Sequence, residues 1–521
     1  MKSIDIDLSP EQYHNTEELH LAIARKLRID ASDIGHTRIL RRSLDLRGQI
    51  RYHTLIEVFL KNEPISQQVF QSPYKDCHKA PPVIIVGAGP SGLFAALRAL
   101  ELGLCPIIIE RGKPVEQRKY DIANITRKKH IDPDCNWCFG EGGAGTYSDG
   151  KLYTRSTKRG DIGSVLAKFV EHGASPEITI DAHAHIGTDK LSNIIANIRN
   201  TIVNHGGQYH FGCRMTDLLI SDNTVHGIVD QNGTHYEGVS VILATGHSAR
   251  DIYELFNRKN WTLEAKPFAL GVRVEHPQQL IDNIQYRGRR NQYLPPASYS
   301  LTSQVDGHGV FSFCMCPGGI IVPAATENGQ QVVNGMSNSK RNSKFANSGI
   351  AVTVSLHDVP EYAHHGALAL LRFQQDVERD FFHAAGDCIN APTQRLTDFC
   401  ENKTSRTLNP SNYMGECTAS PIHQILPPFI TKCLQDGFRQ FDKKMHGFFS
   451  REASILAVES RTSSPVRIPR DNSFQHPQLK NLYPCGEGAG YAGGIVSSAI
   501  DGINCMNNIA QNLSTTAVDG I

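Results

Sequence analysis

Three glycine-rich loops are the residues whose spacing most directly suggests chemistry in this sequence. Each follows the pattern GxGxxG, and the three copies begin at Gly87, Gly140 and Gly488. In a chain with 44 glycines among 521 residues, this pattern is expected by chance only about 0.3 times. Closely spaced glycines expose backbone N–H groups, which bind anionic groups such as phosphate. The spacing therefore predicts a site for a phosphate-containing ligand.

The first loop, Gly87-Ala-Gly-Pro-Ser-Gly92, has the context that gives the pattern meaning. An apolar strand-like run, 83–86, precedes it, a helical pattern follows it, and Glu110 ends the next apolar run. In a dinucleotide-binding β-α-β unit, the glycines permit a tight turn and the close approach of a pyrophosphate. The acidic residue accepts hydrogen bonds from a ribose. The alternative is a tight strand–helix turn without a ligand.

The other two loops have different surroundings. The second, within 139–151, lacks a preceding strand and is predicted to form a backbone cradle, although glycine also marks plain surface loops. The third, within 486–494, directly precedes the last predicted helix, which spans about 495–513. That order would aim the positive end of the helix at the ligand.

Two groups of polar residues are candidates for catalysis. Arg273, Glu275 and His276 fall in a strand-like segment, and a histidine beside an acid can move protons near neutral pH. An ordinary strand with a surface histidine is the alternative. Arg461, with Ser463-Ser464, lies close before the last glycine loop and would bind an anionic substrate or only shape the loop.

The cysteines offer further possibilities. Cys135 and Cys138 have the CxxC spacing of a redox dithiol, or they are two buried small side chains. Cys314 and Cys316 fall short of the four ligands that zinc requires, so we predict no metal. Thirteen cysteines do not resemble a disulfide framework, and the first 27 residues do not resemble a signal peptide. We therefore expect a cytoplasmic protein.

Composition excludes several classes of partner. The 53 basic residues balance 52 acidic ones, so the formal charge of +1 provides no field that would attract nucleic acid or an anionic membrane. The uncharged stretch 80–97 approaches the length of a membrane span. Its glycines and proline break the helix that a span requires, so we predict no membrane span.

The elements that position these residues change character along the chain. Residues 1–70 have the order β-α-β-β, which predicts a ferredoxin-like α+β module, and 71–82 forms a proline-rich linker. Residues 83–250 alternate buried strands and helices, as α/β proteins with a parallel sheet do. A basic cluster in the first module would bind an anion or form a solvated face. It consists of Arg38, Arg41, Arg42 and Arg47.

Taken together, these motifs resemble the FAD-binding domain of glutathione-reductase-like flavoproteins. More closely, the chain resembles a bacterial family of FAD-dependent dehydrogenases whose substrates are largely undefined. The resemblance covers most of the chain, including the N-terminal module. Besides the first loop with Glu110 and Ala244-Thr245-Gly246, it rests on FGEGGAGTYSDGKL (139–152), FALGVRVEHP (268–277), FSFCMCPGG (311–319), VVNGMS (332–337), VESRTSSPVRIPR (458–470) and PCGEGAGYAGGIVSSAIDGI (484–503).

The resemblance implies a non-covalently bound FAD in a Rossmann-like domain of the glutathione-reductase type. That domain would be interrupted, so that 83–250 and 455–521 come together and 251–454 forms a substrate or cap domain. The residues it assigns to FAD are Gly87, Ala88, Gly89, Pro90, Ser91, Gly92, Glu110, Arg111, Arg118, Gly142, Gly143, Ala144, Gly145, Thr146, Ser148, Met215, Ala244, Thr245, Gly246, Gly486, Glu487, Gly493, Gly494 and Ile495.

Roles follow from the same resemblance. The first loop would hold the pyrophosphate, Glu110 the adenosine ribose, and Arg111 the neighbouring phosphate or adenine. The Met215 backbone would meet adenine. Gly486-Glu487 would meet the ribitol, and the backbone of 493–495 would meet the flavin edge.

The expected function is that of an FAD-dependent dehydrogenase or reductase that passes hydride through flavin N5 to or from an unidentified small organic substrate. The chain has no second strand–GxGxxG–helix unit, and hence no obvious nicotinamide domain. Electrons would come from the substrate, a transient nicotinamide or a partner protein. Two alternatives are a flavin-dependent monooxygenase and a flavoprotein accessory module without turnover of its own, docking through its N-terminal module.

Overall fold

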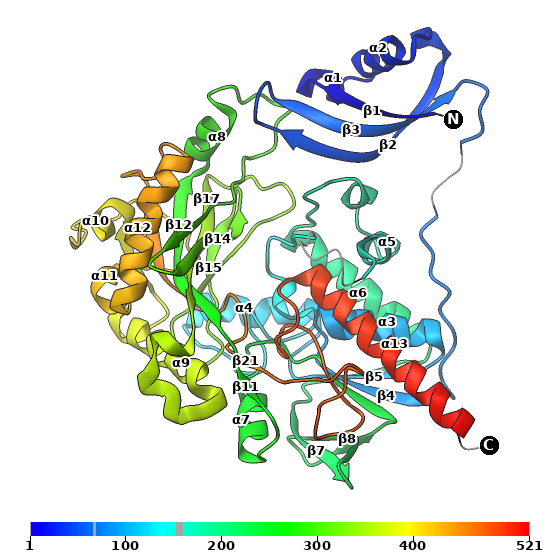
Figure 1. Cartoon of the computed structure of the whole chain (residues 1–521), viewed down its shortest axis with the longest axis vertical. Coiled ribbons are helices and arrows are strands. Elements are labelled where there is room, and N and C mark those ends of the chain that lie inside the picture. Colours follow the sequence, from blue (N-terminus) through cyan, green and yellow to red (C-terminus); the bar gives the residue numbers. More distant parts are fainter. Residues whose placement is uncertain (1, 66–68, 153–159, 520–521) are drawn as a thin grey trace.

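The computed structural model describes residues 2–65, 69–152 and 160–519. The fold is α/β with a parallel sheet, as predicted. Figure 1 shows a small N-terminal module beside two larger parts. One larger part contains the parallel sheet under α3 and α13, and the other contains a second sheet covered on its outer face by α12.

The parallel sheet has five strands in the order β22-β10-β4-β5-β6. Its central strands β10, β4 and β5 are largely apolar because both faces of the sheet are covered. One face packs against α3, α6 and α13, and the other against α7 and the antiparallel meander β7-β8-β9. β22 pairs in parallel with β10, so a C-terminal segment completes a sheet that begins at β4.

In this part the predicted strand 83–86 corresponds to β4, and the predicted last helix begins at residue 495, as expected, and continues to 519. The strands are β4 (Pro82–Val86), β5 (Cys105–Glu110), β6 (Gln208–Phe211), β7 (Met215–Ser221), β8 (Thr224–Asp230), β9 (His235–Glu237), β10 (Ser240–Leu243) and β22 (Leu482–Pro484). The helices are α3 (Pro90–Leu102), α4 (Val115–Lys128), α5 (Ile162–Glu171), α6 (Thr188–Asn204), α7 (Arg250–Arg258) and α13 (Ile495–Asp519).

The second sheet has seven strands in the order β13-β14-β17-β12-β20-β18-β19. They are β12 (Phe268–Pro277), β13 (Thr302–Val305), β14 (His308–Cys316), β17 (Phe345–Val354), β18 (Ala391–Arg395), β19 (Cys417–Ala419) and β20 (Ser454–Glu459). Since β20 pairs with β12 and β18, the second sheet extends to residue 459. A strand that is buried along its whole length shows no pattern that would reveal to which sheet it belongs.

Helices and short ribbons complete this part. The helices are α8 (Gln278–Tyr286), α9 (Ala369–Ala384), α10 (Leu396–Cys400), α11 (Ile422–Ile425) and α12 (Pro428–Lys444). Two short ribbons pair β15 (Ile320–Pro323) with β16 (Val333–Met336), and β11 (Glu264–Ala265) with β21 (Val466–Arg467).

The N-terminal module differs from the ferredoxin-like prediction. Its elements are β1 (Lys2–Leu8), α1 (Pro10–His14), α2 (Thr16–Leu27), β2 (Ile34–Asp45) and β3 (Arg51–Leu60), and its sheet has the order β1-β3-β2. The ferredoxin-like fold adds a second helix and a fourth strand. In the described part of this module, β3 is the last element. The β-α-β-β order is common to both arrangements, so the order alone could not distinguish them.

The basic cluster of this module is neutralised by carboxylates. Arg38 pairs with Glu57 at 3.3 Å and Arg41 with Asp5 at 3.7 Å. Arg47 pairs with Asp45, and Arg42 reaches Asp181 outside the module with a 2.9 Å hydrogen bond. The cluster is therefore a paired surface, and Arg42 helps to attach the module to the rest of the chain.

Among the described residues, no helix has both the length and the apolar character needed to cross a membrane. All thirteen cysteines, which lie within the described ranges, are free thiols.

Candidate functional site

A cavity of 560 Å³ lies at the carboxyl ends of β4 and β5, between the parallel sheet and the second sheet. Such an edge is where ligands bind in open α/β sheets, and the volume is typical of a ligand pocket. Of the 24 residues predicted to bind the cofactor, 18 line it. The six that do not are Ala88, Gly92, Arg118, Gly142, Thr146 and Gly486.

The first glycine loop combines tight packing with open space. A Cβ on Gly87, which has φ +105°, would lie 2.4 Å from the Ala244 carbonyl oxygen, and one on Gly92 would lie 1.9 Å from the Gly87 oxygen. At Gly89 the nearest heavy atom to such a Cβ is 3.9 Å away. No side chain caps α3, so its N-terminal N–H groups remain available to an anion at this point.

Glu110 connects the first two glycine loops. Its buried carboxylate accepts backbone N–H groups from Ala88 at 2.9 Å, Gly112 at 2.8 Å and Gly140 at 3.1 Å. Glu110 also lines the cavity. A carboxylate fixed by three N–H groups is a well-oriented acceptor for a ligand hydroxyl.

Arg118 supports the second loop from behind. It is fully buried, lies outside the cavity lining and donates only to backbone and hydroxyl oxygens of the loop region. Its backbone acceptors are Asn136 (2.8 and 3.0 Å), Trp137 (2.9 Å), Gly140 (3.3 Å), Glu141 (2.9 Å) and Gly143 (2.8 Å). The geometry of Arg118 is that of a residue that shapes the loop.

The N-terminus of α13 forms the third wall. A Cβ on Gly493 or Gly494 would meet no heavy atom within 4 Å. Glu487 lines the cavity nearby. Burial raises the pKa of Glu487 to about 7, although the positive charge of Lys266 acts to lower it. Gly486 is held outside the lining by a 2.7 Å hydrogen bond from its N–H to Asp501.

Three of the four catalytic candidates lie outside the lining of the cavity. β12 is buried nearly throughout, and Arg273, Glu275 and His276 are absent from the lining. His276 Nε2 lies 2.8 Å from the Phe448 carbonyl oxygen, and burial lowers the pKa of His276 to about 4. Burial raises the pKa of Glu275 to about 7. These residues form interior contacts of the second sheet.

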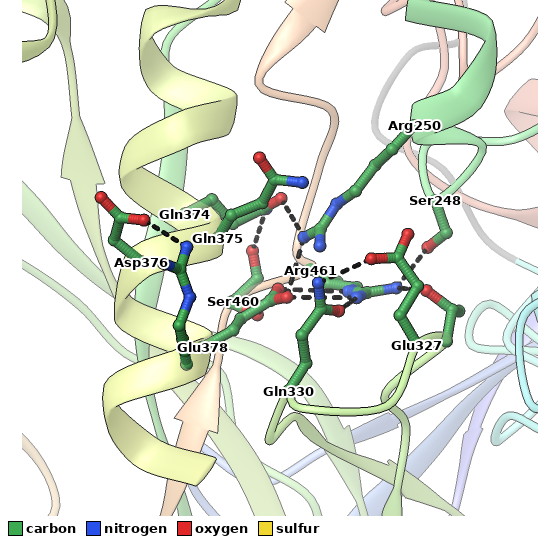
Figure 2. Close-up of polar contacts among 12 residues, drawn as sticks. Ser248, Arg250, Glu327, Gln330, Gln374, Gln375, Asp376, Glu378, Ser460 and Arg461 are labelled. Carbon is green, nitrogen blue, oxygen red and sulfur yellow. Dashed lines mark hydrogen bonds and ion pairs between the residues drawn. The ribbon is translucent and has the colours of Figure 1, made fainter. Parts of the chain in front are cut away.

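Arg461 does line the cavity, but its guanidinium is fully engaged, as Figure 2 shows. Its five N–H donors have acceptors on Glu378 (3.2 Å from both Nε and Nη2), Ser248 (3.2 Å), Thr326 (2.7 Å) and Gln330 (3.0 Å). Glu378 also accepts from Arg250 at 2.8 Å. The cluster joins α9, the N-terminus of α7 and the segment after β20 behind the cavity.

Glu378→Gln is expected to destabilise the fold in a pH-dependent way. Burial alone would raise the pKa of Glu378, but Arg250 and Arg461 lower it to about 2, from 4.5 for an exposed glutamate. This stabilisation is complete above pH 4.5 and is lost as the pH falls towards 2. It amounts to about 3 kcal/mol. Urea unfolding of the variant should show that loss at pH 7 and a weaker pH dependence below 4.5.

A matched control lies on the same helix. Asp376 pairs with Arg379 at 2.6 Å at the surface, so Asp376→Asn should change the unfolding free energy by less than about 1 kcal/mol. Equal effects of the two substitutions would contradict the role given to Glu378.

The structure also brings residues to the cavity that were not predicted as site residues. They include Lys151, His247, Tyr299, Phe313 and Cys314. Most lie within or beside the sequence motifs on which the family resemblance rests, but a motif does not indicate which of its side chains face a ligand.

The CxxC pair is divided between two environments. Cys138 lines the cavity, whereas Cys135 is buried outside the lining, and burial raises its pKa to about 12. A thiol held protonated in this way is a poor nucleophile. The geometry favours the interpretation of Cys135 as a small buried side chain.

One group of possible metal ligands occurs in the part of the chain that the structure describes. It comprises Cys485, Asp501 and Cys505. Arg470 Nη2 lies 2.6 Å from the Asp501 carboxylate, and Arg470 Nη1 lies 3.6 Å from Cys505 Sγ. A guanidinium thus supplies the positive charge that these groups face.

Comparison with known proteins identifies the class. Residues 267–462 match the family model "FAD-dependent protein, C-terminal domain-like", and residues 1–59 match a domain of unknown function, DUF8436. An uncharacterized protein of Clostridium beijerinckii is 37% identical over 515 residues, which cover 95% of this chain and 96% of that protein. The chain therefore belongs to the same family as this relative, and the match to the FAD-dependent family model makes it a flavoprotein. The predicted family and the predicted cofactor are confirmed.

Solved structures with similar folds are more distant. CtdE in complex with FAD is 12% identical, with 85% of this chain and 91% of that chain covered and a TM-score of 0.33. A geranylgeranyl bacteriochlorophyll reductase-like protein from Thermoplasma acidophilum is also 12% identical, with 84% and 79% covered and a TM-score of 0.35.

The cavity fits FAD by its own chemistry. Gly89, Gly493 and Gly494 leave open space where any side chain would intrude, and two helix N-termini, those of α3 and α13, begin at its wall. Helix N-termini and bare glycine backbone suit a pyrophosphate and the electron-rich edge of a flavin. Flavin chemistry is oxidation and reduction, which makes an oxidoreductase the class of enzyme to expect.

Proposed function

We propose that the protein is an FAD-dependent dehydrogenase or reductase that transfers hydride between flavin N5 and a small organic substrate. The observation that carries this proposal is a single cavity with two unlike halves. One half consists of glycine loops and helix N-termini, and the other includes side chains from β14 and from residues 299–300, which precede β13. Such an arrangement would hold a dinucleotide on one side and a substrate on the other.

The predicted cofactor residues have consistent places in this proposal. The N-terminus of α3 with Gly89 and Ser91 would bind the pyrophosphate, and Glu110 would accept a ribose hydroxyl. Arg111, which pairs with Asp251 at 2.7 Å, would border the adenine side with Met215. The N-terminus of α13 would face the flavin ring.

The substrate half favours a molecule with an apolar body. Its apolar side chains include those of Tyr299, Phe311, Phe313 and Met315. The cationic Lys151 lies at the same wall and would attract an anionic substituent. We also propose a nicotinamide or a partner protein as electron donor. Thirteen free thiols are consistent with the cytoplasm as the site of action.

The experiment is anaerobic mixing of the purified holoprotein with NADH, NADPH and candidate organic reductants, while the absorbance of oxidised flavin is followed. Rapid loss of this absorbance with one reductant, and its return with an organic acceptor, would support the proposal. Free FAD under the same conditions is the control.

Two other outcomes would overturn it. Stoichiometric oxygen consumption with hydroxylation of the substrate would identify a monooxygenase. Flavin that stays oxidised with every reductant, while the N-terminal module captures a macromolecule, would identify an accessory protein.

A further inference from the structure

Cys314 and Cys316 lie at the end of β14, where the strand is irregular. The pairing of β14 with β17 shifts register between Phe313 and Cys316, and Cys314 has a left-handed φ of +46°. A bulge redirects side chains, and a left-handed backbone at a residue other than glycine is sparsely populated and concentrated at functional sites. Here the result is that Cys314 lines the cavity, while Cys316 is fully buried behind it.

The two cysteines are neighbours in contact, but their thiols have different surroundings. Cys316 Sγ lies 3.3 Å from the Cys314 carbonyl oxygen. The neighbouring Cys316 side chain lowers the pKa of Cys314, and the neighbouring Cys314 side chain, together with burial, raises the pKa of Cys316. Cys314, which is half-buried at the cavity wall, is thus the better thiolate, and the fully buried Cys316 holds the proton.

On balance, the charged groups around the pair also lower the pKa of Cys314. Arg273 Nη1 donates to the Cys314 carbonyl oxygen at 3.3 Å, and Lys151 donates to the Met315 carbonyl oxygen. Three acids are also close enough to Cys314 to act on it through their charge. They are Asp149, paired with Arg341, Glu459, paired with Arg273 at 2.7 Å, and Glu487, whose pKa burial raises to about 7. Each acid is therefore paired or easily neutralised, while Lys151 and Arg273 stabilise a thiolate.

We propose that Cys314 and Cys316 form a thiol–disulfide exchange site that opens onto the cavity and acts on small disulfides. The Cys314 thiolate attacks one sulfur of the disulfide, forms a mixed disulfide and releases the other half as a thiolate. Cys316 then attacks the Cys314 sulfur and releases the second half, which takes up the Cys316 proton. The dithiol loses two electrons and the small disulfide gains them. This activity goes beyond the proposed hydride transfer and needs no flavin.

Cys138 provides a matched control, since it also lines the cavity but lacks a resolving partner. Cys135, the other member of its motif, has a pKa raised to about 12 by burial. When both thiols are equally accessible, the difference in reactivity between Cys314 and Cys138 measures the effect of the partner thiol and of the local charge.

The test uses glutathione disulfide as the probe on purified holoprotein, with intact-mass measurement and peptide mapping. Wild-type protein should lose two hydrogens and yield a linked Cys314–Cys316 peptide without an adduct. Cys316→Ser should accumulate glutathione on Cys314, and Cys138→Ser should behave like wild type. An adduct on another cysteine, or no adduct on Cys314 in Cys316→Ser, would overturn the proposal.

Alkylation of the unmodified protein covers the case of a variant that fails to fold. Iodoacetamide at about pH 6 should label Cys314 at least about 10-fold faster than Cys138, because a lowered pKa raises the thiolate fraction at that pH. Equal rates would contradict the proposal. Both experiments measure the reactions of thiols and not those of the flavin. Thiol–disulfide exchange can therefore be observed even if hydride transfer is absent, and hydride transfer can be observed even if exchange is absent.

Discussion

Gly89→Val is expected to abolish flavin binding while the protein stays folded. An added Cβ at Gly89 meets nothing closer than 3.9 Å, so the fold can accept it, but the side chain would extend into the space at the N-terminus of α3. A displaced pyrophosphate loses at least two charge-assisted hydrogen bonds, which corresponds to about a 100-fold or larger loss of affinity. Flavin absorbance per protein, with titration of added FAD, measures the effect.

Gly92→Ala separates a lost site from a lost fold. Its Cβ would lie 1.9 Å from the Gly87 carbonyl oxygen, where only movement of the backbone can relieve the contact. This variant should lower the melting temperature substantially, whereas Gly89→Val should leave the melting temperature of flavin-free protein nearly unchanged. Stoichiometric flavin in Gly89→Val would show that the phosphates lie elsewhere.

The second large effect is expected for Arg118→Ala. This substitution removes the donor to the Asn136 and Trp137 carbonyl oxygens and one of two donors to those of Glu141 and Gly143, at a cost of about 1–3 kcal/mol for each oxygen left unpaired where water cannot reach it. We expect a loss of about 4 kcal/mol in unfolding free energy together with weakened flavin binding. Denaturant unfolding of the flavin-free protein isolates the first effect.

The neighbouring Lys119 supplies the control for Arg118. Lys119 is exposed on the same helix, α4, so Lys119→Ala should change neither stability nor flavin content measurably. If Arg118→Ala lost flavin but kept its full stability, Arg118 would be a direct ligand, as the resemblance implied, and its role behind the loop would be wrong.

Local patterns were enough to predict the parallel core and the family. The run 83–86, the first glycine loop and Glu110 stand in one β-α-β unit, and such a unit is specified by neighbours in the chain. Met215, Gly493 and the second loop were placed by resemblance, and they line the same cavity. Secondary structure and sequence motifs depend on residues that are close together in the chain, so the sequence by itself determined them.

The surroundings of each polar side chain were decided only by the tertiary structure. His276 and Glu275 have residue types suited to catalysis, but pairing of β12 on both sides buries them within a sheet. Cys314 had no distinguishing spacing, yet a bulge places it on the cavity wall. Burial, charge and access depend on segments hundreds of residues apart, and these long-range contacts decide which of the chemically able side chains can meet a ligand.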